Sequence, residues 1–204
     1  MARPRSFDEA HVLEQARAVF WDGGYAGTSM DDVMTATGLG KGSLYGAFGD
    51  KRQLFLRVFA DYCDGLLAAA RQALDPAQGD AADQVDGFLR RSAEGTAADI
   101  AHRGCLLAKA TAELSQSDND VITRARATFT VIEDLLTTAI ERAQDDGRLT
   151  QAASARDLAR LVLAASRGIE ALGKAGLYGQ DLASIAETTI RLLHADTVPS
   201  PASD

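Results

Sequence analysis

The fold of this chain is decided by residues 28–51, TSMDDVMTATGLGKGSLYGAFGDK. Ser29 is a favoured helix N-cap, and Asp32, three residues later, completes the pattern of a capping box. Gly38 stands where a helix ends in a left-handed residue. The stretch therefore predicts two short helices joined by a tight glycine turn, with a third helix opening directly after them.

The second of these short helices, over about residues 41–48, has two unlike faces. Leu44 and Phe48 are four residues apart and share the side expected to face the core. The opposite side carries Lys41, Gly42, Ser43, Tyr45 and Gly46. Each glycine costs a helix roughly 1 kcal/mol relative to alanine, so two of them indicate close approach to another surface. A helix-turn-helix that places its second helix in the major groove of DNA has this arrangement.

The region from Phe7 to about Tyr62 resembles the DNA-binding domain of the TetR family of transcriptional regulators. The resemblance is carried by residues 24–55, GYAGTSMDDVMTATGLGKGSLYGAFGDKRQLF. The sequence departs from the family at Met34, where many relatives have a smaller alanine. An ordinary helical hairpin in a protein core is the alternative interpretation. The resemblance implies an all-α protein of about nine helices, with an N-terminal three-helix DNA-binding domain and a C-terminal helical domain for ligand binding and dimerisation.

The composition is that of a globular protein. The 204 residues suffice for one large or two small domains, and 46% are hydrophobic and 25% charged. No apolar run reaches membrane-spanning length, and the N-terminal residues lack the apolar core of a signal peptide. Two cysteines form no disulfide framework, so a reducing cytoplasm is expected. Without a phosphate loop, a dinucleotide fingerprint or a nucleophile elbow, we expect neither enzymatic activity nor a cofactor, and three scattered histidines predict no metal site.

The net charge of −8 is unusual for a protein that binds DNA. Residues 1–52 hold six Lys/Arg against seven Asp/Glu, so the N-terminal part carries −1. Its cations cluster in the N-terminal arm, at the start of the second short helix, and at Lys51 and Arg52. Phosphate contacts are short-range at physiological salt, so local placement matters more than the total. We expect weak non-specific binding to DNA.

The prolines and caps divide the chain. We expect a first domain over residues 1–52 and a second over 53–195, connected by a helix over about 50–74, with a disordered tail over 196–204. Ser6 is expected to cap the first helix, which should end at Gly23 and Gly24, and Asp50 to cap the connecting helix. Further helices are expected over residues 81–98, 104–116, 119–145, 154–175 and 180–195.

The roles in DNA recognition follow from residue type and position. Base reading is expected from Lys41, Gly42, Ser43 and Gly46. Thr28 and Ser29 begin a helix whose free amides attract phosphate, and the resemblance implies phosphate contacts for Lys51 and Tyr45. Tyr45 is alternatively a half-buried core aromatic. Arg3 and Arg5 lie on an arm that would reach a minor groove, or in a solubilising tail.

The second domain is expected to bind a small effector and a second copy of the chain. The last two helices are apolar with small residues, so they form either a dimer interface, as the family implies, or part of the monomer core. The candidate effector-binding residues are Tyr62, Leu66, Phe88, Cys105, Leu106, Ala110, Phe129, Ile132 and Arg167. For all of them except Arg167, plain core packing is the alternative. Arg167 and Glu170 would orient a polar ligand or pair at the interface.

Cys105 has two interpretations of its own. It begins a helix next to Arg103, and both features favour the thiolate of a redox or electrophile sensor. A small buried apolar residue is the alternative. Taken together, the sequence predicts a dimeric, ligand-responsive transcriptional repressor that binds a palindromic operator. The alternatives are an activator or structural DNA-binding protein without a ligand, and a helical small-molecule-binding or thiol-reactive protein whose DNA-binding function has lapsed.

Overall fold

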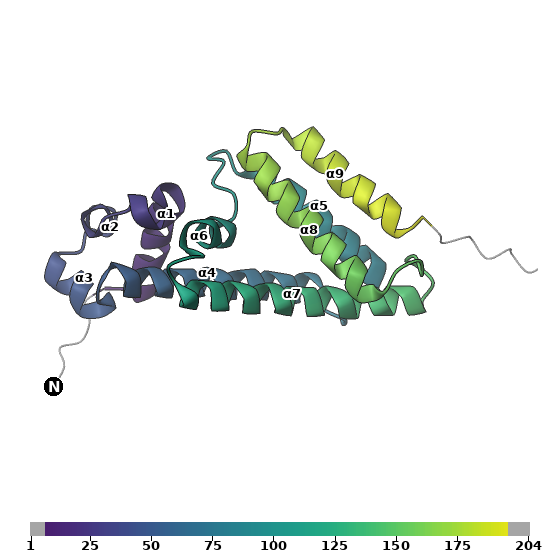
Figure 1. Ribbon diagram of the computed structural model, residues 1–204, viewed down its shortest axis with the longest axis horizontal. Helices are drawn as coiled ribbons and strands as arrows, with labels where there is room; N and C mark the ends of the chain where they lie inside the picture. Colours follow the sequence, from purple (N-terminus) through teal and green to yellow (C-terminus); the bar gives the residue numbers. More distant parts are fainter. Residues whose placement is uncertain (1–6, 196–204) are drawn as a thin grey trace, which may run out of the picture. The chain divides into compact units, whose positions relative to one another are not determined.

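The computed structural model describes residues 7–195, and every regular element within them is an α-helix (Figure 1). The helices are α1 (Glu9–Gly27), α2 (Met30–Thr37), α3 (Lys41–Phe48), α4 (Lys51–Ala73), α5 (Ala81–Ala98), α6 (Leu106–Leu114), α7 (Asn119–Asp145), α8 (Ala155–Lys174) and α9 (Gly179–Leu193). The predicted all-α class is confirmed for this part of the chain. Arg3, Arg5, Ser6 and the tail over residues 196–204 lie outside the described residues.

Most helix boundaries agree with the sequence-based prediction, but α1 differs at both ends. Its N-cap is Asp8, whose carboxylate accepts a hydrogen bond from the N–H of Ala10 at 3.0 Å, whereas Ser6 was the predicted cap. Helical structure resumes after Gly24 and continues to Gly27, with non-helical angles at Gly24 itself (φ 74°, ψ 175°). The glycine pair therefore produces a kink instead of the predicted end.

The described chain forms two compact units. The first contains the residues up to Leu66 together with Cys105–Ala127, and the second contains Leu67–Gly104 and the residues from Thr128 onward. Helix α6 thus belongs with the N-terminal helices, although the predicted division at residues 52 and 53 assigns it to the second domain. The predicted domains, residues 1–52 and 53–195, stay a prediction.

The first unit is built around aromatic side chains from α1 and α4. Phe20 and Phe55 meet edge to face with their centroids 5.1 Å apart, and Phe55 stacks on Phe59 at 5.9 Å. All three are fully buried, and such rings contribute large apolar areas to a core. Leu44 and Phe48 of α3 are also buried, so the predicted inward face of α3 is confirmed. Helix α1 packs against both α2 and α6.

The turn between α2 and α3 has the predicted local geometry. Ser29 and Asp32 form a reciprocal capping box at the start of α2. Gly38 ends α2 in the left-handed conformation (φ 66°, ψ 9°), which costs a residue with a β-carbon more than it costs glycine. Asp50 caps α4 by accepting a hydrogen bond from the N–H of Gln53 at 2.8 Å, as predicted. These caps fix where α2 and α4 begin, and they leave α3 as a short helix between two turns.

The second unit is a helical bundle in which α5 packs against α8 and α9. Figure 1 shows α8 and α9 running side by side in opposite directions. Its core also takes apolar side chains from the second half of α7 and the end of α4. The largest fully buried members of this core are Leu89, Leu136, Ile140, Leu149 and Ile169. This arrangement covers the inner faces of α8 and α9 and leaves part of their outer faces exposed.

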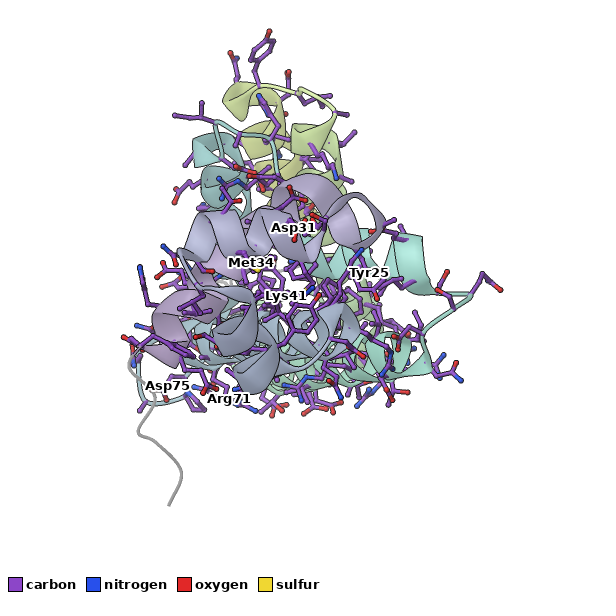
Figure 2. The ribbon with its side chains drawn as sticks, turned by 90° about the vertical axis from the view of Figure 1, so that its left-hand side faces the viewer. Tyr25, Asp31, Met34, Lys41, Arg71 and Asp75 are labelled. Atoms are coloured by element: carbon purple, nitrogen blue, oxygen red, sulfur yellow. The ribbon has the colours of Figure 1, made fainter. Side chains whose placement is uncertain are left out.

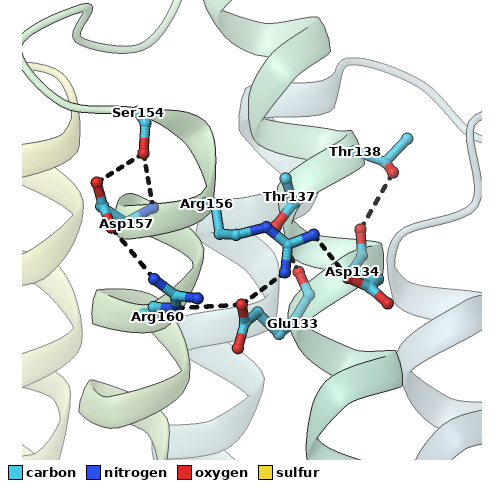
Figure 3. Close-up of polar contacts among 8 residues, drawn as sticks. All are labelled: Glu133, Asp134, Thr137, Thr138, Ser154, Arg156, Asp157 and Arg160. Carbon is cyan, nitrogen blue, oxygen red and sulfur yellow. Dashed lines mark hydrogen bonds and ion pairs between the residues drawn. The ribbon is translucent and has the colours of Figure 1, made fainter.

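A cluster of ion pairs joins α7 to the start of α8 (Figure 3). The guanidinium of Arg156 contacts Glu133 at 2.8 Å and Asp134 at 2.9 Å, and Arg160 contacts Glu133 at 3.1 Å. Ser154 caps α8 by accepting a hydrogen bond from the N–H of Asp157. Because both arginines are exposed to solvent, each of these ion pairs contributes little to the free energy of folding. The cluster fixes how the first turn of α8 meets α7.

Candidate nucleic-acid interface

The outward face of α3 is the best-defined candidate site. Lys41, Gly42 and Ser43 are exposed, and so are Tyr45 and Gly46 on the following turn. Figure 2 looks onto α2 and α3, with Asp31 and Met34 labelled on α2 and Lys41 on α3. The structure therefore brings the five residues predicted for α3 onto one accessible surface.

The two glycines of α3 have no packing role within the described chain. A β-carbon added to Gly42 or to Gly46 would meet nothing within 4 Å. Glycine weakens a helix, and here no neighbouring element requires its small size. The missing side chains make the face of α3 shallow, so that a surface from outside the chain can approach its backbone closely.

Two lysines of the first unit, one on this face and one at the start of α4, are held over aromatic rings. The ammonium group of Lys41 lies 5.7 Å from the ring centroid of Tyr45, and that of Lys51 lies 4.5 Å from the ring of Tyr25. A cation over an aromatic face is held by the quadrupole of the ring. Unlike a carboxylate, the ring adds no negative charge that would repel an anionic partner.

The start of α2 is a weaker anion site than the sequence predicts. Thr28 is 3% exposed and its hydroxyl donates to the carbonyl of Val19, so its side chain serves the protein interior. The carboxylate of Asp32 accepts hydrogen bonds from the hydroxyl and the N–H of Ser29, and these bonds lower the pKa of Asp32. With Asp31 next to it, the first turn carries two carboxylates that repel phosphate. Backbone amides remain as the groups at this end that attract an anion.

Arg52 is bound within the first unit. Its guanidinium donates from Nε to Asp118 at 2.7 Å and from Nη2 to the same carboxylate at 3.0 Å, and it also contacts Asp120. The hydrogen bonds from Arg52 lower the pKa of Asp118. The expected cationic pair at the start of α4 is thus divided, because Arg52 faces two carboxylates whereas Lys51 lies over the ring of Tyr25.

The residues predicted to bind an effector fall into two sets. Tyr62, Leu66, Cys105, Leu106 and Ala110 belong to the first unit, and Phe88, Phe129, Ile132 and Arg167 to the second. Within the first set, the hydroxyl of Tyr62 donates to Sγ of Cys105 at 3.6 Å. In the second, Ile132 is part of the buried core and Phe88 packs against it. A single effector pocket formed by the nine residues stays a prediction.

Arg167 has partners inside the second unit. Its guanidinium contacts the carboxylate of Glu170 at 2.8 Å and the hydroxyl of Ser166 at 3.1 Å. Ser166 is fully buried and also lies 2.9 Å from the hydroxyl of Ser92 on α5. This pair forms between neighbouring turns of α8, and the two predicted roles, orienting a polar ligand and pairing at the dimer interface, stay predictions.

A hollow that the sequence analysis missed lies between α5 and α9. It has a volume of about 180 Å³ and is lined by Arg90, Ala93, Glu94, Ala97, Gly179, Ala183, Ala186 and Glu187. Arg90 donates to Glu187 at 2.6 Å, and these hydrogen bonds lower the pKa of Glu187. Alanines at helical spacing on both helices were the available signal, because small side chains leave space where helices meet. The hollow is smaller than the pockets that usually hold a drug-sized ligand.

Comparison with known proteins identifies this arrangement of α1 to α4. Residues 12–58 match the model of bacterial regulatory proteins of the tetR family, and residues 81–185 match that of the tetracyclin repressor-like C-terminal domain. The chain belongs to the TetR family. The members of this family are DNA-binding transcriptional regulators with an N-terminal helix-turn-helix and a C-terminal helical domain, which confirms the predicted fold class and the resemblance.

Individual TetR relatives align over most of the chain. The transcriptional regulator YezE of Bacillus subtilis is 29% identical over 73% of this chain and 76% of its own length. The transcriptional repressor ComR of Escherichia coli is 25% identical over 93% of this chain and 90% of its own. Among solved structures, a cysteine mutant of the TetR family regulator CifR, complexed with 26-bp operator DNA, is 28% identical with a TM-score of 0.80, over 93% of this chain and 98% of that one.

Two further observations concern residues 7–195. No helix among them is both long enough and apolar enough to cross a membrane. Nowhere in this part of the chain do three or more histidine, cysteine or carboxylate side chains gather into a group that would hold a metal ion.

Proposed function

We propose that this TetR family member is a dimeric repressor that binds a palindromic operator through α3 and is released by a small molecule. The observation that carries the DNA-binding part is the exposed face of α3, with two glycines that no intramolecular contact requires. The operator complex of the related regulator CifR supports the same partner. A protein that acts on the bacterial chromosome works in the cytoplasm.

The proposed DNA contacts follow from the charge and the position of each side chain. Lys41 and Ser43 present donors that suit guanine and other base edges in a major groove, while Gly42 and Gly46 let the helix backbone approach. Lys51 and Tyr45 would hold phosphates on either side. The two kinds of contact predict different effects of mutation. A phosphate contact contributes to the affinity for every DNA sequence, whereas a base contact contributes only to the affinity for the operator sequence.

We expect Lys41→Ala and Lys51→Ala to weaken DNA binding in different ways. Lys41→Ala should reduce affinity for the operator by about tenfold or more and leave affinity for scrambled DNA nearly unchanged. Lys51→Ala should weaken both DNAs alike and lower the dependence of log K on log salt by about one unit. Fluorescence anisotropy titrations at two salt concentrations measure these quantities, using DNA from upstream of the protein's own gene. Equal losses on both DNAs for Lys41→Ala would contradict its role in base reading.

The dimer is proposed to form through the outer faces of α8 and α9. Leu161 and Leu172 on α8 are 46% and 38% exposed, and Leu192 on α9 is 60% exposed. Between the two leucines of α8 lie Ala165 and Gly168, whose small size allows a second helix to come close. Two copies joined along this face would present two α3 helices, as a palindromic site requires.

The effector is proposed to bind the helices that follow the helix-turn-helix and to shift the protein toward a form with poor spacing of the two α3 helices. A thermal-shift screen of metabolites, run with and without operator DNA, tests this part. A compound that stabilises the protein and lowers operator affinity supports it. An activator or structural DNA-binding protein without an effector would bind operator and respond to no compound.

A second candidate function is thiol sensing by Cys105. Cys105 is the N-cap residue of α6, and the hydroxyl of Tyr62 donates to its sulfur at 3.6 Å. A helix N-terminus and a hydroxyl donor both stabilise a thiolate. Burial works against this role, since Cys105 is only 6% exposed and an oxidant must reach it through local opening.

Oxidation experiments test this candidate. If Cys105 is the sensor, hydrogen peroxide should convert its thiolate to a sulfenic acid, releasing hydroxide, and should lower operator affinity by about tenfold. Cys105→Ser should keep its affinity under the same treatment, whereas Cys63→Ser, which replaces the other buried cysteine, should respond like the unaltered protein. Anisotropy titrations before and after treatment give the result. Unchanged affinity of the oxidised wild type would reject thiol sensing.

A further inference from the structure

The kink in α1 opens the backbone of that helix next to α6. At Gly24 the chain takes φ 74°, and a β-carbon there would lie 2.9 Å from the carboxylate of Glu113. A break of this kind ends the ladder of i to i−4 hydrogen bonds, so carbonyls before it and N–H groups after it need other partners. Glycine is suited to both demands, the positive φ and the close approach of a side chain.

Two side chains of α6 bind the backbone on both sides of the kink. The ammonium group of Lys109 donates to the carbonyls of Trp21 and Asp22 at 2.7 and 2.8 Å. The carboxylate of Glu113 accepts from the N–H of Tyr25 at 2.8 Å and from the N–H of Ala26. Lys109 and Glu113 are four residues apart and therefore share one face of α6. A cation meets carbonyls and an anion meets amides, which is the favourable order at broken helix ends.

The residue held by Glu113 in turn holds a DNA-contacting cation. The ring of Tyr25 lies 4.5 Å from the ammonium group of Lys51 and packs against Phe55, with centroids 4.9 Å apart. The hydrogen bond to Glu113 holds the backbone of Tyr25, which positions the Tyr25 ring. The ring in turn positions the ammonium group of Lys51. The path from α6 to Lys51 runs through two contacts, the hydrogen bond from Tyr25 to Glu113 and the Lys51–Tyr25 contact, and both lie within one compact unit.

We propose that Lys109 and Glu113 are positioning residues for DNA binding, which set operator affinity by holding Tyr25 under Lys51. The inference rests on the DNA-binding function proposed above. It adds that α6 acts on Lys51 through Tyr25 of α1. Glu113 is exposed and Lys109 partly so, so their contacts are worth little to overall stability. Their removal should therefore change DNA binding more than folding.

The test compares Glu113→Ala, Glu113→Gln and Lys109→Met with Glu141→Ala, which removes an exposed glutamate from α7. Operator affinity should fall about tenfold for Glu113→Ala and less for Glu113→Gln, which keeps one acceptor oxygen, and should not change for Glu141→Ala. Thermal midpoints should stay close to that of the unaltered protein. Glu113→Gln keeps the experiment informative if the alanine variant folds poorly.

The chain contains one tryptophan, Trp21, so intrinsic fluorescence reports on this junction. The Trp21 ring meets the Tyr62 ring edge to face at 5.0 Å, and the Trp21 carbonyl is bound by Lys109. Lys109→Met should increase quenching of Trp21 by acrylamide, while Glu141→Ala should not. A general loss of stability would instead lower the thermal midpoint of Lys109→Met, which the comparison with the unaltered protein detects.

A double-mutant cycle decides whether Glu113 acts through Lys51. If it does, Glu113→Ala should weaken operator binding in the unaltered protein and cost almost nothing further when Lys51→Ala is already present. Additive losses, or an affinity of Glu113→Ala equal to that of Glu141→Ala, would overturn the positioning role. If the unaltered protein binds no operator, the proposed DNA-binding function fails first, which is a different result from loss of the coupling alone.

Discussion

Gly46→Glu is expected to abolish operator binding while the protein remains folded. The β-carbon of residue 46 enters open space on the outward face of α3, so the new side chain meets no atom of the described chain. In a major groove the same side chain would place a carboxylate against base edges and phosphates. Like charges brought together in an interface cost several kcal/mol, so we expect affinity to fall by about a hundredfold or more. Titration against operator DNA measures the loss.

The stability of this variant should be unchanged or slightly raised, because glutamate is a better helix former than glycine by about half a kcal/mol. Gly95→Glu is the matched control. Gly95 is also an exposed helical glycine near the end of its helix, α5, with nothing within 4 Å of an added β-carbon. The Gly95→Glu variant carries the same added charge, and its affinity for operator DNA should be unchanged. If Gly46→Glu bound operator as tightly as Gly95→Glu, α3 would not enter the groove.

Leu161→Arg is expected to convert the dimer into a monomer. Leu161 is nearly half exposed on α8, in the stripe that continues through Ala165 and Gly168 to Leu172. In a twofold interface every substitution occurs twice, so two guanidinium groups would be buried without partners. Sedimentation velocity should show the monomer mass, and operator affinity should fall by about a hundredfold as the second DNA-contacting unit is lost.

Ile100→Arg is the control for this second prediction. Ile100 is 90% exposed in the segment between α5 and α6, outside the proposed interface. Ile100→Arg also replaces a large exposed apolar residue with arginine, and it should leave the protein dimeric. A dimeric Leu161→Arg would place the interface elsewhere, and the stripe on α8 would then need another explanation.

The local features of α2, α3 and the turn between them could be predicted from the sequence. The capping box of Ser29 and Asp32, the left-handed Gly38 and the opposed faces of α3 all follow from spacings of three or four residues. The same holds for the bounds of α5 and α7, which agree with the prediction. Such signals are reliable because one turn of helix brings these residues together wherever the helix lies.

The partners of the charged residues could not be predicted in this way. Arg52 was grouped with Lys51 as a cation for phosphate, but in the structure it is held by Asp118, 66 residues away. Lys109 reaches the carbonyl of Trp21, 88 residues away, and nothing in the spacing of the sequence connects α6 with α1. The hollow between α5 and α9 likewise depends on how two helices meet.

The sequence by itself determined where the helices begin and end in most of the chain, and which face of α3 is bare. These properties arise from backbone capping and helical periodicity, which act over a few residues. Only the tertiary structure decided that Thr28 is buried, that Arg52 is neutralised and that α6 belongs with the first unit. Those outcomes depend on which side chains, far apart in the sequence, the fold brings within hydrogen-bonding distance. Composition and the spacing of residues along the chain do not show which side chains will meet.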